Sequence, residues 1–315
     1  MKIGISIPNN WGVPDAPSLI DLAVQAEDRG FASVWTSEHL INLDYVRARI
    51  GDGAYYHPLA MLSAIAARTN RIQLGTSVLV LPFHSPFDVA KYIATLDQIS
   101  RGRVILGVGV GNVREEFDVL GIPWARRGAI TDESLDVIRA LWTQEDARHE
   151  GERWQFSGIR TSPKPYRGRR VPIWIGGMSR AASKRAVRVG DGWHPTGITP
   201  AQLREQADAI RELARANGRD PDSVEICMRF NVALDDAEIT EVELRSTVKG
   251  GDMARAADIA GQFRDAGATH FIFALNSHDA AVLSRTVDQF AEELLPNFAD
   301  DGGCAGFARG RSVTG

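Results

Sequence analysis

Cysteine is nearly absent from this sequence. The 315 residues include only two, Cys227 and Cys304, and these form no pair with the spacing of a metal site. Small disulfide-stabilised folds and cysteine-ligated metal centres are therefore excluded. A reducing compartment fits this composition, and we expect a cytoplasmic protein.

Long apolar runs are also missing. No stretch approaches the roughly 18–20 apolar residues that span a bilayer, and the opening MKIGISIPNN lacks the charged and apolar regions of a signal peptide. The charge is balanced, with 36 Lys and Arg against 40 Asp and Glu and a net charge of −4. Such a surface suits neither nucleic acid nor an anionic membrane, so we expect neither as a partner.

The common hydrolase motifs are absent as well. There is no HExxH, no G-x-S-x-G, and no His-x-His on the first apparent strand, where the chain reads PNN. Without these spacings, neither a zinc hydrolase nor a serine nucleophile is predicted. We therefore expect no metal site, although His39, His57, His84 and His194 all fall near strand ends or loops.

What the chain does contain is a regular alternation of two patterns. Longer stretches have a helical period, as in Leu19, Leu22, Ala23 and Ala26. Between them lie short β-branched runs, which predict strands at Lys2–Pro8, Ser33–Glu38, Ile72–Val80, Val104–Val110, Pro172–Gly177, Gly192–Pro195, Val224–Ala233 and Thr269–Leu275.

Eight strands that alternate with helices over about 300 residues pair in parallel, and eight is the number that closes a barrel. Helix-start signals at Pro58, Ser179 and Asp252 fit this alternation. We therefore predict an α/β protein with a single (β/α)₈ TIM-barrel domain over residues 1–299. A doubly wound open sheet is the alternative. The Gly-rich segment 300–315 has no periodic apolar face and is predicted to be a disordered tail.

Several connections are long. Three follow predicted strands, at Leu40–His57, Asn112–Arg127 and Asp235–Gly251, so in a barrel they lie at the C-terminal face and build the walls of an active site. The helix-to-strand connection Thr143–Arg170 is also long. Its apolar residues predict that it packs against the rest of the chain.

The end of the second strand carries the first candidate residues, because barrel active sites form at C-terminal strand ends. It reads Glu38-His39, and neighbours on a strand point to opposite faces, so one of the two faces the barrel mouth. A histidine there can hydrogen-bond a heterocycle or transfer a proton near neutral pH. A histidine bonded only to a neighbouring loop is the alternative.

The fourth strand carries three glycines, Gly107, Gly109 and Gly111, before Asn112. Their spacing and their place in the chain differ from those of the dinucleotide-binding fingerprint. Because glycine has no side chain, the three would leave one face of the strand end bare, so that a flat ring can lie against it.

The fifth strand passes into a helix through the turn Gly176–Ser179. Backbone N–H groups and the positive end of the helix dipole suit an anion at such a turn, and a plain helix cap is the alternative. The sixth strand ends in Trp193-His194, which adds an aromatic residue and a second histidine near the same rim.

Together these segments resemble a known family. The matching pieces are GFASVWTSEHL (30–40), NRIQLGTSVLVLPFHSPFDVAKYIATLDQISRGRVILGVGVGNVREEF (70–117), PKP (163–165) and VPIWIGGMSRAASKRAVRVGDGWHP (171–195). In their order and spacing they are similar to the luciferase-like monooxygenases and their coenzyme F420-dependent relatives, which are TIM barrels. The last third of the chain matches only in its alternation.

The resemblance implies site residues position by position. His39 would lie beside the reactive edge of a flavin or deazaflavin, as a catalytic residue, and the non-proline cis peptide of the family would fall at Ser77–Val78. The implied cofactor site consists of His39, Thr76, Ser77, Val78, Val110, Gly111, Asn112, Gly176, Gly177, Met178 and Ser179. Its last four residues, Gly176 to Ser179, would bind the cofactor phosphate.

One position departs from part of the family. The F420-dependent sugar-phosphate dehydrogenases carry a glutamate where this chain has Asn112. An asparagine cannot donate or accept a proton in the same way. Sugar-phosphate oxidation is therefore not expected, and a catalytic acid–base role would fall to His39 or Glu38.

The leading hypothesis is an oxidoreductase that uses coenzyme F420 to transfer a hydride to or from a small organic substrate. The alternatives are an FMN-dependent monooxygenase, which uses reduced flavin and O₂, and a non-catalytic flavin-binding protein. Reductant would come from an external reductase or F420-reducing system, and the resemblance implies a homodimer. An apolar or aromatic substrate is suggested by aromatic residues predicted near the mouth, which are Trp11, Tyr55, Tyr56, Phe83 and Trp193.

Overall fold

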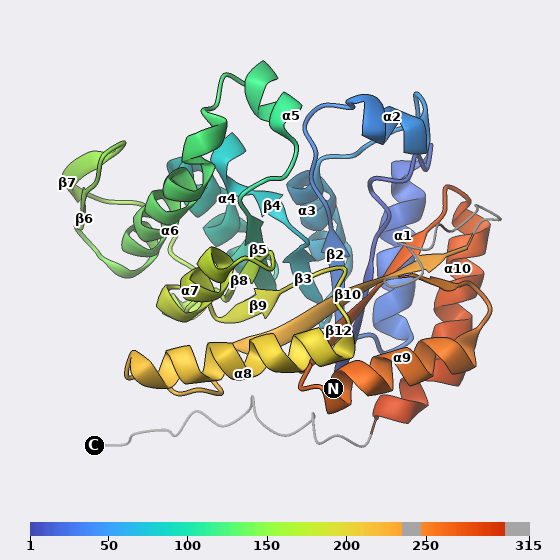
Figure 1. Ribbon diagram of the computed structural model, residues 1–315. Coiled ribbons are helices and arrows are strands. Elements are labelled where there is room, and N and C mark those ends of the chain that lie inside the picture. The colour runs from blue at the N-terminus through green and yellow to red at the C-terminus, as the bar shows by residue number, and fades with distance from the viewer. Residues whose placement is uncertain (235–246, 300–315) are drawn as a thin grey trace, which may run out of the picture.

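The computed structural model describes residues 1–234 and 247–299, and these form a parallel barrel surrounded by helices (Figure 1). Each wall strand pairs in parallel with its neighbours, and β9 pairs with β10 to close the ring. The predicted (β/α)₈ barrel is confirmed, and the open sheet is excluded. The wall strands are β1 (Lys2–Ser6), β2 (Ser33–Thr36), β3 (Gln73–Thr76), β5 (Val104–Gly109), β8 (Ile173–Gly176), β9 (Gly192–His194), β10 (Glu225–Ala233) and β12 (His270–Asn276).

Helices cover the outside of the barrel, and two short helices, α2 and α5, form part of its long loops (Figure 1). Helix α1 shows why they dock: Leu19, Leu22 and Ala26 form an apolar face that is buried against the strands. The helices are α1 (Ala16–Asp28), α2 (Asp44–Ile50), α3 (Pro58–Arg68), α4 (Pro86–Ile99), α5 (Arg114–Val119), α6 (Arg127–Thr143), α7 (Arg180–Arg188), α8 (Pro200–Ala216), α9 (Met253–Asp265) and α10 (Ala280–Gln289).

Short helical turns supplement these elements, and the predicted helix starts are confirmed. Pro58 is the first residue of α3, while Ser179 and Asp252 cap α7 and α9 by accepting hydrogen bonds from backbone N–H groups. The 3₁₀ turns span Leu81–Phe83, Trp124–Arg126, Tyr166–Gly168 and Leu295–Phe298, and a π-helical turn spans Phe290–Leu294.

The third predicted strand is interrupted. The sequence predicts one strand over Ile72–Val80, but the structure has β3, then a break, then β4 (Leu79–Val80), which pairs with β5. The break is the bulge Ser77–Val78, and its peptide bond is cis, as the family resemblance implied. The chain therefore steps inward between two halves of one strand.

The connection Thr143–Arg170 contains a hairpin that the sequence analysis did not predict. Its strands β6 (Ala147–Glu150) and β7 (Gln155–Ile159) pair antiparallel outside the barrel. Phe156 contacts Phe87 of α4 with 5.4 Å between ring centres, so the predicted packing of this connection is confirmed.

One short strand lies at the edge of the predicted connection Asp235–Gly251. It is β11 (Thr247–Lys249), which pairs in parallel with the end of β10. The rest of this connection, residues 235–246, lies outside the described residues, and so does the segment 300–315 that was predicted to be a tail.

Two tryptophans fill the barrel interior below its C-terminal mouth. Trp35 and Trp174 stack with 5.0 Å between ring centres. Glycines on neighbouring strands make room for them: a Cβ on Gly75 would overlap the Trp35 ring, and one on Gly192 would lie 2.5 Å from Trp174. Large residues thus face residues without side chains, which closes the barrel core beneath the mouth.

Strand pairing is uneven around the ring. Strand β10 pairs with β12 at every position from Cys227 to Ala233, but with β9 only at Glu225 and Ile226. Above those two pairs, a single isolated bridge joins Thr196 to Arg229. The β9–β10 joint, like the β3–β5 joint, therefore has few backbone hydrogen bonds.

Across residues 1–234 and 247–299, no helix combines the length and apolar character needed to cross a membrane.

Candidate functional site

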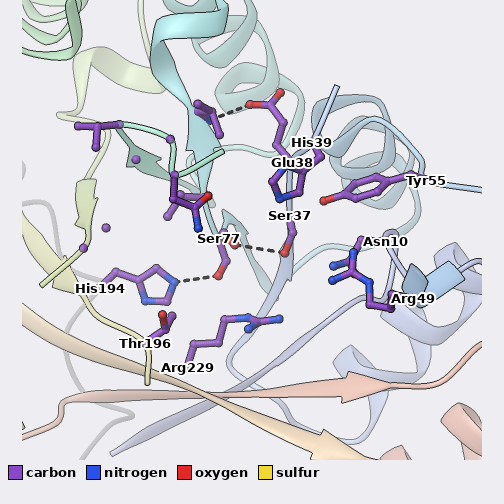
Figure 2. A pocket seen from close by; sticks show the side chains of 18 residues that line it. Asn10, Ser37, Glu38, His39, Arg49, Tyr55, Ser77, His194, Thr196 and Arg229 are labelled. Carbon is purple, nitrogen blue, oxygen red and sulfur yellow. Dashed lines mark hydrogen bonds between the residues drawn. The ribbon is translucent and has the colours of Figure 1, made fainter. Parts of the chain in front are cut away.

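A pocket of about 380 Å³ opens at the C-terminal ends of the barrel strands (Figure 2). This is the face on which the sequence predicted an active site. The pocket is lined by Asn10, Ser37, Glu38, His39, Arg49, Tyr55, Ser77, Val78, Val80, Gly109, Val110, Gly111, Asn112, Gly176, Gly177, His194, Thr196 and Arg229.

Most of the predicted site residues converge on this pocket although they come from separate strands. Three of them do not line it: Thr76 is buried beneath it, whereas Met178 and Ser179 are exposed outside it. Those that line the pocket are Glu38, His39, Ser77, Val78, Val110, Gly111, Asn112, Gly176 and Gly177.

The glycines of β5 accommodate the Ser77–Val78 bulge. A Cβ on Gly107 would overlap the carbonyl oxygen of Thr76, and one on Gly109 would lie 2.6 Å from Val78 Cγ2. The interpretation that these glycines leave a bare strand face is therefore corrected. The bulge occupies the space beside Gly107 and Gly109, so Val78 presents a small apolar surface to the pocket, which Gly109 and Gly111 also line.

Glu38 holds the far side of the bulge. Its carboxylate accepts a hydrogen bond from Val80 N–H at 2.7 Å, drawn in Figure 2, and lies 2.8 Å from His84 Nε2. The side chain is buried, with 3% of the residue exposed. Both carboxylate oxygens are thus engaged, which fits a positioning role better than proton transfer.

His39 is oriented by a second buried carboxylate. Its Nδ1 lies 2.8 Å from Glu116 Oε2, while Glu116 Oε1 accepts a hydrogen bond from Leu40 N–H at 2.8 Å. Because a carboxylate only accepts, Nδ1 carries the proton and donates it. The other ring nitrogen, Nε2, is then an acceptor, and the Tyr45 hydroxyl lies 2.5 Å from it.

The second predicted histidine, His194, supports the bulge from the opposite side. Its Nε2 lies 2.8 Å from Ser77 Oγ, and Ser37 donates a hydrogen bond to the Ser77 carbonyl at 3.2 Å (Figure 2). Burial, reinforced by the positive charge of Arg229, lowers the pKa of His194 to about 3. This histidine is therefore neutral at physiological pH.

The turn after β8 contains the helix cap that was one of the two interpretations offered for it, and the anion site stays a prediction. Ser179 caps α7 by accepting from Ala182 N–H at 3.2 Å. Gly177 has a φ of +110°, a conformation that suits glycine, and its carbonyl accepts a hydrogen bond from the Trp193 indole at 2.7 Å. The exposed turn is thus held rigidly at the pocket edge.

The sequence analysis missed several lining residues. Arg229 lies between the apolar residues Met228 and Phe230 of β10, and that charge within a strand was the available signal. Arg49 lies in α2, within a long loop, and nothing local marks it. Asn10 and Thr196 follow strand ends without a motif. Of the five aromatic residues predicted near the mouth, Tyr55 lines the pocket.

The described part of the chain, residues 1–234 and 247–299, contains no group of three or more His, Cys, Asp or Glu side chains placed to hold a metal ion.

Comparisons with known proteins agree with this geometry. The sequence profile described as luciferase-like monooxygenase matches residues 1–296. The F420-dependent glucose-6-phosphate dehydrogenase of Amycolatopsis mediterranei is 29% identical over 88% of this chain and 93% of its own length. The enzyme of the same name from Kineococcus radiotolerans is 30% identical over 88% and 92%.

A solved structure with a similar fold is that of the monooxygenase RslO1 from Streptomyces bottropensis. It superimposes with a TM-score of 0.77 at 26% identity, over 95% of this chain and 100% of that one.

Proposed function

This chain belongs to the luciferase-like monooxygenase family, and from that premise we propose that it is a coenzyme F420-dependent oxidoreductase, which transfers a hydride to or from a small organic substrate. The observation that carries the proposal is the convergence of the family segments on one pocket at the barrel mouth. Relatives named F420-dependent dehydrogenases, aligned over most of both chains, support the choice of cofactor.

The pocket fits a planar ring system. Val78 and Val110 give it an apolar wall, held from behind by the Glu38 and Ser77–His194 contacts. Within the pocket, the buried hydroxyl of Tyr55 and the buried Nε of Arg229 have no hydrogen-bond partner in the described part of the chain. Buried polar atoms without partners mark places where a ligand supplies the missing hydrogen bonds.

We assign the cofactor to three parts of the pocket. Ser77 and Val78 would contact the ring system, Val110, Gly111 and Asn112 would face both cofactor and substrate, and the turn from Gly176 to Ser179 would bind the phosphate through backbone N–H groups. Thr76 supports this site indirectly, because its hydroxyl donates to the Gly107 carbonyl at 2.6 Å.

His39 is the proposed catalytic residue. When bound, F420 supplies a two-electron hydride transfer at its ring. Because Nδ1 donates its hydrogen bond to Glu116, Nε2 of His39 is the nitrogen that would accept or return a proton of the substrate, and the substrate would have to replace the Tyr45 hydroxyl that lies 2.5 Å from it. Glu38 is assigned to positioning, since its oxygens are bound to Val80 and His84.

We further propose that the protein is a cytoplasmic homodimer that receives reduced cofactor from an external F420-reducing system. The composition with two cysteines fits a reducing compartment. Light scattering on the purified protein tests the dimer, because a monomeric mass at working concentration would contradict it.

The first experiment is a parallel titration of the purified protein with F420 and FMN, followed by the fluorescence of each ligand. We expect tight binding of F420 and weak binding of FMN. The opposite order would support the second candidate, an FMN-dependent monooxygenase, which the 26% identity to RslO1 favours. If a folded protein bound neither ligand, both candidates would be wrong.

A further inference from the structure

Arg229 has more hydrogen-bond donors than partners. A guanidinium carries five N–H donors, and the hydrogen bond found for this one runs from Nη1 to Asn231 Oδ1 at 3.1 Å. Its Nε is buried without a partner, and within residues 1–234 and 247–299 no carboxylate pairs with it. Burial lowers its pKa to about 10, which still leaves the group charged at neutral pH.

Other arginines of this fold have charge partners or several acceptors, although Nε of Arg139, which pairs with Asp191 through Nη2 at 2.5 Å, also lacks a partner. Arg103 donates to backbone carbonyls of α3 and its neighbours, including Ala66 at 3.0 Å. Arg185 binds both oxygens of Asp132, at 2.8 and 3.0 Å. Those side chains stabilise the fold, whereas Arg229 directs unused donors into the pocket. The Arg229 side chain is half-buried, its Nε is fully buried, and its charge has no counter-ion among the described residues, so these unused donors indicate a ligand.

Two further donors approach the same part of the pocket. Figure 2 shows Arg49 and Arg229 reaching it from opposite sides, with Tyr55 and Asn10 beside Arg49. The Arg49 guanidinium lies 5.2 Å from the centre of the Trp11 ring and makes no ion pair with a described residue. The Tyr55 hydroxyl is buried without a partner, and burial raises the pKa of Tyr55, so it stays a neutral donor.

No acidic group balances these cations among the lining residues. Glu38 is the one carboxylate in that set, and it is bound to Val80 N–H and His84. The electrostatic field at this end of the pocket is therefore positive, and charge-assisted donors converge there in the manner that oxyanions require.

We propose that Arg229, Arg49 and Tyr55 form an oxyanion subsite that binds a carboxylate or phosphate group of the substrate. As an assignment of substrate class, the proposal rests on the proposed function, since it places this anion beside His39 while the cofactor occupies the opposite wall. The substrate is then an organic anion, which adds a charged group to the apolar or aromatic body that the sequence suggested.

Calorimetry on the F420-loaded protein tests the subsite with two probes, inorganic phosphate and benzoate. We expect at least one of them to bind, and Arg229→Gln and Arg49→Gln each to weaken that binding tenfold or more, about 1.4 kcal/mol. Arg148→Gln is the matched control, because this exposed arginine lies outside the pocket on β6. The probe that binds more tightly identifies the anionic group of the substrate. Tighter binding of benzoate indicates a carboxylate, and tighter binding of phosphate indicates a phosphate ester.

Thermal melting supplies a second readout, because it measures the stability of each variant both without and with the anion. Without anion, Arg229→Gln should melt no lower than the wild type, because it removes a half-buried charge that has no counter-ion among the described residues. The better probe should raise the melting temperature of the wild type and leave that of Arg229→Gln unchanged. Arg49→Gln allows the same comparison in a variant that should fold normally, because Arg49 is an exposed residue of a helix.

The outcomes separate this proposal from the proposed function. If F420 binds but neither anion does, or if anion binding is unchanged in both arginine variants, the subsite is wrong and the function stands. Displacement of the anion by F420 would also overturn it, because the site would then belong to the cofactor. If F420 fails to bind while Arg229-dependent anion binding persists, the cofactor assignment fails and the subsite remains.

Discussion

The contact between His39 and Glu116 decides which ring nitrogen carries the proton. Glu116 is almost fully buried, with 1% exposed, and accepts hydrogen bonds from Leu40 N–H and from His39. This arrangement leaves Nε2 as the acceptor nitrogen of the neutral imidazole, with the Tyr45 hydroxyl 2.5 Å from it. The carboxylate acts through the histidine and is a positioning residue.

Glu116→Gln should therefore reverse the tautomer of His39. A glutamine can still accept from Leu40 N–H, but its amide then donates toward Nδ1, which forces the proton onto Nε2. We expect turnover to fall about 100-fold, the lower end of general acid–base contributions, with F420 affinity unchanged. Absorbance assays of F420 turnover and ¹⁵N NMR of the His39 ring measure the two effects.

The neighbouring Glu115→Gln provides the control for that prediction. Glu115 is exposed on the same helix, so its loss of charge should leave both readouts at wild-type values. Equal losses in the two variants would show that the charge of α5, not the hydrogen bond to His39, matters for turnover.

At the scale of elements, the Ser77–Val78 bulge depends on the glycines that face it. Gly109→Ala places a methyl group 2.6 Å from Val78 Cγ2, closer than side chains approach, so the bulge must move into the pocket. We expect F420 binding to weaken at least about tenfold, or about 1.4 kcal/mol, in a protein that still folds. Fluorescence titration measures it.

Gly261→Ala is the matched glycine variant. It lies in α9 with no atom within 4 Å of the added Cβ. This change should raise stability by about 0.5–1 kcal/mol, because alanine loses less conformational freedom in a helix. If Gly109→Ala binds F420 as tightly as Gly261→Ala does, the bulge does not set the cofactor site.

Elements differed in how well local sequence predicted them. Every wall strand was predicted from a short apolar run between two helical patterns, because parallel strands that are buried on both faces are apolar along their length. The break at Ser77–Val78 came only from the family resemblance, because both of its halves are apolar. The hairpin of β6 and β7 lacks a two-residue turn signal and carries Arg148 and His149 in its first strand, so no pattern marked it.

Across the whole molecule, the barrel interior contains two neutral histidines. Burial lowers the pKa of His194 and of His270 from an ordinary value of 6.5 to about 3. His270 Nε2 lies 2.6 Å from Ser33 Oγ, inside the core around Trp35 and Trp174. The unfolded chain therefore binds protons at pH values where the folded chain does not.

Stability should accordingly fall as the pH drops below about 6.5, by about 1.4 kcal/mol per pH unit for each histidine until about pH 3. Above about pH 6.5 both groups are neutral in both states and contribute no slope. Urea unfolding at about pH 7.5 and about pH 5.5 tests this, with His270→Gln as the comparison. The variant should lose one histidine's share of the slope, and an unchanged slope would contradict the assignment.

The pocket itself was predictable only in part. His39, Ser77 and Gly176 belong to continuous segments with a recognisable pattern, and the structure brings them together. Arg49 and Arg229 are 180 positions apart in the chain and meet only through barrel closure. A pattern in one segment carries no information about such a pair, because their proximity is set by the order of strands in the ring.

The uneven closure of the barrel places a sparsely paired joint, between β9 and β10, next to Arg229. Below that residue, β9 and β10 share two paired positions, and Arg229 itself forms the isolated bridge to Thr196, just beyond β9. Amide hydrogen exchange should therefore be faster along this joint than between β10 and β12. An anion bound by Arg229, Arg49 and Tyr55 would tie β10 at this joint to α2 and the segment after it, so anion binding and the local stability of β10 become thermodynamically linked.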